Sequence, residues 1–166
     1  MDGTVVQYLQ QMGAASDRQA VLRTFENVAS LSNSVALSSA ALAIKTGGSA
    51  LAKNGSVFYA VAAGKLVTIA ANTDMPALTG MDIAAGKYNV VCFFIDSAGT
   101  VTAKQGTEGS AIGTVKFPDF PVGKALVGAL LITYASAFVG GTTALDTATT
   151  VYLSPTGAVN PTLLFS

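Results

Sequence analysis

The stretch YNVVCFFI at residues 88–95 is almost wholly apolar and is rich in β-branched and aromatic side chains. A run of this length and composition predicts a central β-strand that is buried on both faces. The turn-forming residues DSAG follow it at 96–99, and residues 100–104 then alternate between polar and apolar side chains. This order predicts that 100–104 is the hairpin partner of the central strand.

Short β-type runs continue on both sides of this strand, with Gly, Asn and Asp between them. These runs cover residues 35–45, 56–62, 66–70, 111–115, 125–134 and 149–153. Residues 63–65 (AGK) predict a tight hairpin. About seven or eight short strands at this spacing predict a mainly β fold, either an antiparallel β-sandwich or a small barrel. Because no long linker divides the region, we expect residues 32–166 to form one β-domain.

Residues 1–31 follow a different pattern, which we interpret as an N-terminal helical arm or cap. Ser16 and Gln19 have the spacing of a capping box and predict a short helix from 17 to about 30. The apolar residues at helical spacing are Val5, Leu9, Met12, Val21, Leu22, Phe25 and Val28. A helix this short is not stable alone in water, so it must contact either its own β-domain or a partner.

Charged residues are scarce, at 11% of the chain, while 51% of residues are hydrophobic. Small or apolar residues must therefore occupy many exposed positions, and a neighbouring subunit is expected to bury some of them. Nine basic and nine acidic residues cancel and are scattered singly. Without a basic stripe, nucleic acid is not an expected partner.

A membrane span is not expected either. Residues 125–145 are uncharged and about as long as the roughly 20 residues that a spanning helix needs. Their second half contains GGTT at 140–143, which indicates a loop, so the first half is better interpreted as a buried strand. The segment MDGTVVQYLQQMG at 1–13 lacks the basic start and apolar core of a secretory signal.

The sequence offers little catalytic chemistry. It contains no histidine, which excludes histidine-based triads and the commonest zinc ligand. Its one cysteine, Cys92, lies within the apolar run at 88–95 and is expected to act as a small hydrophobic residue. A carboxylate-pair hydrolase would draw on Asp74, Asp82, Asp96, Glu108, Asp119 and Asp146. Each stands beside turn-forming residues and is expected to cap a turn instead, so we predict no enzyme, no cofactor and no metal.

Two short motifs have simpler structural interpretations. Gly-Lys occurs at 64–65, 86–87 and 123–124, just before predicted strands, but a phosphate loop needs Ser or Thr next and the chain has Leu, Tyr or Ala. We therefore expect Gly to supply a backbone angle that other residues disfavour. The sequon at 54–56 (NGS) is interpreted first as a turn.

The β region from about Ala50 to Phe165 resembles the head decoration, cement or head-fibre proteins of tailed bacteriophages. The segments that carry this resemblance are YNVVCFFIDSAGTVTAKQGTEG at 88–109, VKFPDFPVGKALVGALLI at 115–132, FVGGTTALDTATTVYL at 138–153 and GAVNPTLLF at 157–165.

The resemblance implies a non-catalytic virion protein that is made in the host cytoplasm and binds the capsid surface. Its partners would be the major capsid protein and copies of itself, often as a trimer, with residues 1–31 as a possible capsid-contacting arm. The alternative is a receptor- or glycan-binding module of a head or tail fibre, in which exposed Tyr and acidic loop residues would bind the ligand.

Overall fold

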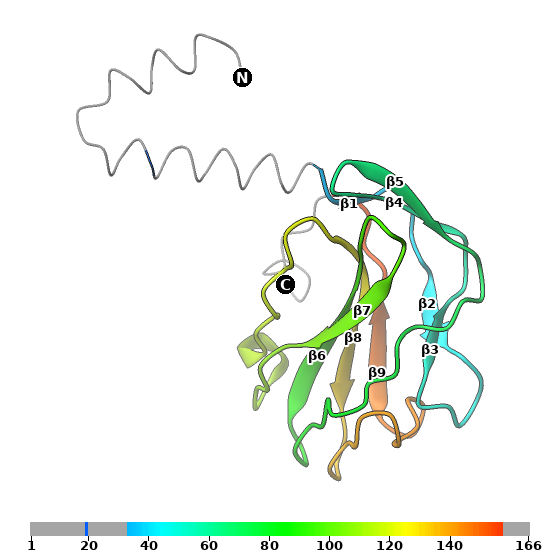
Figure 1. Ribbon diagram of the computed structural model, residues 1–166. Coiled ribbons are helices and arrows are strands. Elements are labelled where there is room, and N and C mark those ends of the chain that lie inside the picture. The colour runs from blue at the N-terminus through cyan, green and yellow to red at the C-terminus, as the bar shows by residue number, and fades with distance from the viewer. Residues whose placement is uncertain (1–18, 20–32, 158–166) are drawn as a thin grey trace.

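The computed structural model describes Gln19 and residues 33–157, and the chain is mainly β with antiparallel sheets (Figure 1). The described strands are β1 Val35–Ala36, β2 Leu42–Ile44, β3 Ala52–Asn54, β4 Phe58–Ala62, β5 Lys65–Ile69, β6 Tyr88–Ile95, β7 Val101–Gln105, β8 Ala125–Thr133 and β9 Thr149–Leu153. One 3₁₀ turn, η1, covers Ile112–Thr114. The coarse prediction of a mainly β, antiparallel fold is confirmed.

The largest sheet has four strands in the order β7-β6-β8-β9, and β6 lies in its interior. β6 pairs with β7 on one side and with β8 on the other, for example through Val91 opposite Leu130. Every residue from Asn89 to Ile95 is buried. The predicted central strand, buried on both faces, is therefore confirmed, as is its hairpin with residues 101–105.

Two smaller sheets cover one face of this sheet. They have the strand orders β1-β4-β5 and β2-β3. Phe58, Ala60 and Ala62 point inward from β4 and join Phe93 of β6 in the main hydrophobic core. The strand order of the four-stranded sheet ends at β7 and β9, which do not pair with each other in the described part of the chain, so this sheet is open.

A proline-bounded connection covers part of the opposite face. Cys92 and Phe94 of β6 face this side and pack near Phe117 and Phe120. The rings of Phe94 and Phe120 meet edge to face, with centroids 5.1 Å apart and planes at 72°. The rigid segment at 117–121 therefore shields this second face of β6 from solvent, while the main core shields the first.

A β-bulge interrupts the pairing of β6 with β8. Phe93 lies opposite Gly128 and Phe94 opposite Leu126, so Val127 is the extra residue. A Cβ atom at Gly128 would lie 2.5 Å from both the Leu153 carbonyl oxygen and the Leu42 side chain. Only glycine fits where three strands approach this closely.

The start and the end of the described β region are joined. Ala36 in β1 and Gly157 after β9 form an antiparallel bridge, in which the Gly157 N–H donates to the Ala36 carbonyl at 2.8 Å. The edge strand β1 therefore contacts residues 121 positions later in the chain (157 − 36).

The predicted strand at 111–115 is wrong, because this segment contains η1. The Thr114 hydroxyl accepts from the Ala111 N–H at 3.1 Å and donates to the Ala111 carbonyl at 2.8 Å. Such local bonds satisfy the backbone without a sheet partner. The run at 35–45 contains two strands, β1 and β2, separated by a bend with Ala41 at φ 48°, and the short strand β3 was not predicted.

The structural interpretation of the Gly-Lys pairs is confirmed. Gly64, Gly86 and Gly123 have φ of 77°, 69° and 75°, in the left-handed region that favours glycine. Gly64 completes the tight hairpin between β4 and β5, as the sequence predicted. The N-terminal arm or cap, including the predicted helix at 17–30, lies outside the described residues except for Gln19.

Candidate functional site

Cys92 serves as a core residue, as its sequence context predicted. Its side chain is fully buried in the middle of β6. Burial disfavours the charged form and raises the pKa of the Cys92 thiol to about 12. Because the thiolate is the nucleophilic form, this cysteine has neither the access nor the ionisation that a reactive thiol needs.

Asp96 caps the turn between β6 and β7, as predicted. Its carboxylate accepts hydrogen bonds from the Thr100 N–H at 2.9 Å and the Ala98 N–H at 3.0 Å. The Thr100 bond, followed by the Ala98 bond and the charge of Lys124, lowers the pKa of Asp96 below 3.8. Stability from this carboxylate is therefore present above pH 3.8 and is lost as the pH falls through the lower folded-state pKa.

Most of the other candidate carboxylates do not cap their own turns. They bind instead to groups that lie far from them in the sequence. Asp74 forms an ion pair with Lys45. Backbone N–H groups donate to three of the remaining four, from Gly140 to Asp82 at 2.9 Å, from Ala84 to Glu108 at 2.8 Å and from Gly48 to Asp146 at 2.8 Å. At Asp119, the sixth candidate, it is the backbone carbonyl that accepts, from the Lys104 ammonium. The bonds to the carboxylates of Asp74, Asp82, Glu108 and Asp146 give these four side chains structural roles that the local sequence does not reveal.

Asn54, the first residue of the sequon, is a buried structural residue. Its side-chain amide donates to the carbonyls of Ser56 at 2.9 Å and Ala70 at 2.8 Å, and its oxygen accepts from the Thr73 N–H at 2.7 Å. The interpretation of this sequon as a turn, rather than as a glycan acceptor, agrees with these bonds.

Between residues 33 and 157, no group of three or more His, Cys, Asp or Glu side chains could hold a metal ion. The same residues include no helix whose length and apolar character would allow it to cross a bilayer.

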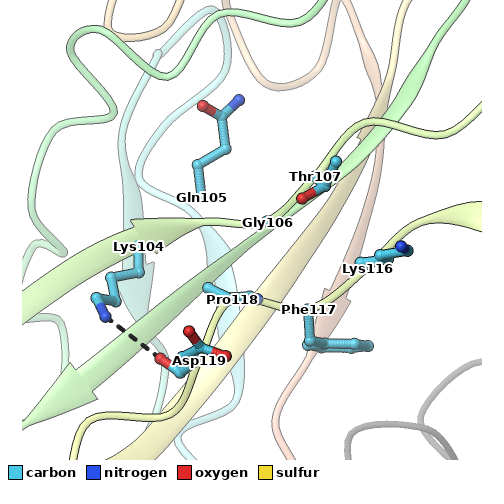
Figure 2. A pocket seen from close by; sticks show the side chains of 8 residues that line it. All are labelled: Lys104, Gln105, Gly106, Thr107, Lys116, Phe117, Pro118 and Asp119. Carbon is cyan, nitrogen blue, oxygen red and sulfur yellow. Dashed lines mark hydrogen bonds between the residues drawn. The ribbon is translucent and has the colours of Figure 1, made fainter.

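A small polar pocket, which we call the β7 pocket, lies where the chain leaves β7 (Figure 2). It has a volume of about 450 Å³ and is lined by Lys104, Gln105, Gly106, Thr107, Lys116, Phe117, Pro118 and Asp119. The backbones of Thr107 and Lys116 exchange two hydrogen bonds, at 2.9 and 3.2 Å. The Lys104 ammonium donates to the Asp119 carbonyl at 3.3 Å. The pocket therefore offers amine, hydroxyl and carboxylate groups to a small polar ligand. The Gln105 side chain points away from the pocket and donates to the Asp82 carbonyl at 2.8 Å (Figure 2).

The β1-β4-β5 sheet leaves an apolar surface uncovered. On β4, Tyr59 and Val61 point away from the core while their neighbours point into it. The outward residues of this sheet and its margins form what we call the outer apolar face, consisting of Val35, Leu37, Val57, Tyr59, Val61 and Leu66. Leu66 is 61% exposed, Leu37 55% and Tyr59 45%. The strands of this sheet were predicted from the sequence, but the outer apolar face was not.

The predicted arm residues Val5, Leu9, Met12, Val21, Leu22, Phe25 and Val28 lie outside the described residues, so their role stays a prediction. Comparisons of the chain with protein-family models, with curated proteins and with solved structures find no match. The described surfaces offer two kinds of contact, apolar packing at the outer apolar face and polar binding at the β7 pocket.

Proposed function

We propose that the chain is a virion structural protein, built on an open β-sandwich, that binds the outside of a phage capsid lattice and stabilises or decorates it without catalysis. One contrast supports this proposal most. Most of the candidate reactive groups are buried or already have partners within the chain, whereas the outer apolar face of the β-domain is left uncovered. The thiol is buried, and five of the six candidate carboxylates hold loops or a lysine, while the outer apolar face remains exposed.

Binding to a capsid would combine many weak contacts. Apolar side chains on the surface contribute by burial against a partner, and repeated copies multiply the effect through avidity. The sequence resemblance to decoration and cement proteins points the same way, as does the low charge density. A homo-oligomer, with three copies as the expected size, would supply the multivalency.

Copy number in purified virions tests this function. Quantitative mass spectrometry should give a ratio to the major capsid protein near one to one, or a simple fraction of it. A handful of copies per particle would instead indicate a fibre or tail component. Complete absence from particles would overturn the virion assignment.

Deletion of residues 1–31 tests the arm. We expect the truncated protein to keep its β fold, because the main core draws on residues from Ala36 to Ala148, and to lose most of its binding to capsids. Circular dichroism would check the fold, and sedimentation with capsids stripped of this protein would measure binding. Full retention of binding would show that the arm is not the capsid contact.

The β7 pocket is the specific feature that favours the alternative, a receptor- or glycan-binding module. If this alternative holds, a glycan array should show saturable binding that is lost on Lys116→Glu, which changes an exposed pocket residue. The matched control is Lys87→Glu, an exposed lysine that does not line the pocket. Binding that both variants retain would assign the ligand to another surface.

A further inference from the structure

The outer apolar face arises from the way in which residues of β1, β4 and β5 are paired. Val35, Val61 and Leu66 lie directly opposite one another across β1, β4 and β5. The next row continues with Tyr59 opposite Thr68, and the Leu37 N–H donates to the Tyr59 carbonyl at 2.8 Å. Residues directly opposite one another point to the same side of a sheet, so these side chains form one continuous surface.

The side chains of this surface are not part of the main hydrophobic core. The alternate residues of the same strands, among them Phe58, Ala60 and Val67, fill the main core. The two outward rows contain no charged side chain. An exposed, contiguous and uncharged sheet face of this kind marks a contact site.

The chain enters the described region beside this face. The Asn33 carbonyl accepts from the Gly64 N–H at 2.8 Å, which places Asn33 at the turn between β4 and β5, next to the start of β1 (Figure 1). From Val28 to Asn33 the chain can span at most about 17 Å. Three adjacent strands are only about 10 Å across from first to last. Val28 can therefore reach any strand of the face.

The preceding sequence has the matching chemistry. Val21, Leu22, Phe25 and Val28 form one apolar stripe, while Arg18, Arg23 and Glu26 fall on the other side of the same helical pattern. We propose that the outer apolar face is the docking site for this stripe of the same chain. The short tether gives the stripe an effective concentration in the millimolar range, which favours it over the same segment of a second copy.

This inference narrows the proposed function. If residues 21–28 cover the outer apolar face within one chain, that face holds the N-terminal segment in place and does not itself touch the capsid. The docking divides the N-terminal segment into two parts. Residues 21–28 would anchor the segment to the β-domain, and Val5, Leu9 and Met12 would remain as the part that reaches a partner.

Paired cysteines test the docking in the full-length chain. Phe25→Cys is combined in turn with Leu37→Cys, Tyr59→Cys and Leu66→Cys, and mild oxidation is followed by non-reducing electrophoresis and mass spectrometry. The buried native Cys92 stays out of the exchange. We expect an intrachain disulfide in at least one pair, and none when Phe25→Cys is combined with Ile112→Cys on η1. A disulfide-linked dimer would overturn the proposal in favour of a second copy, and failure of all three face pairs would also overturn it.

Limited trypsin digestion gives a second, independent readout. Docking should protect the bond after Arg23, and Leu66→Glu should release the segment because it places a charge on the face. We expect cleavage after Arg23 to become about tenfold faster, the change that corresponds to about 1.4 kcal/mol. The control is Val139→Glu, at another exposed valine outside the face. An unchanged rate in Leu66→Glu would contradict the docking.

Discussion

Phe93→Ala is expected to lower the free energy of unfolding by about 3–5 kcal/mol, the usual cost of removing a buried phenylalanine ring. Phe93 is fully buried in the main core and belongs to β6, one of the two interior strands of the four-stranded sheet. The space is not easily refilled, because paired strands, β7 and β8, flank β6 and Phe93 belongs to the main core cluster. Guanidinium-induced unfolding, followed by circular dichroism, would measure the change.

The control for this prediction is Val122→Ala, since Val122 is 85% exposed. We expect its effect to stay within about 0.5 kcal/mol. Because the whole fold is held by only about 5–15 kcal/mol, Phe93→Leu provides a milder variant that should remain measurably folded. A loss below about 1 kcal/mol for Phe93→Ala would mean that the face of β6 toward β4 is not the main core.

Gly128→Ala is expected to destabilise the fold by at least about 1–3 kcal/mol, the cost of overpacking a core. The added methyl group would lie 2.5 Å from the Leu153 carbonyl, and a backbone atom of a paired strand cannot move aside without disturbing the ladder. β9 would have to shift away from β8 at the bulge. Hydrogen exchange should therefore show faster exchange in β9 than in β6.

Gly113→Ala is the matched control, because a Cβ atom at Gly113 would meet nothing within 4 Å. We expect its effect on the unfolding midpoint to fall within about 0.5 kcal/mol. Equal effects at Gly113 and Gly128 would contradict the close approach of β8, β9 and β2.

Much of the fold could be predicted from local patterns. Residues 88–95 are apolar without interruption, and only a strand with cover on both faces can bury such a run. The turns at 63–64 and 96–99 carry the residues that hairpins need, and both hairpins were placed correctly. The error at 111–115 arose because the Thr114 side chain closes a local turn, which a strand pattern does not reveal.

Features that depend on distant segments could not be predicted. Asp146 and Gly48 are 98 residues apart, so nothing near either residue indicates their hydrogen bond. The outer apolar face was hidden for a similar reason. In the run at 58–62, both sets of alternate residues are largely apolar, and only the three-dimensional packing decides which set is left uncovered.

The bridge between Ala36 and Gly157 has a consequence for how the protein is made. During synthesis on the ribosome, β1 emerges early, but its partner after β9 emerges only when nearly all of the described region has been translated. Pairings between such distant segments form slowly, and uncovered strand edges invite association in the meantime. Newly made chains should therefore reach their final form only after Gly157 has left the ribosome, and a stalled chain that ends before Gly157 should remain sensitive to protease.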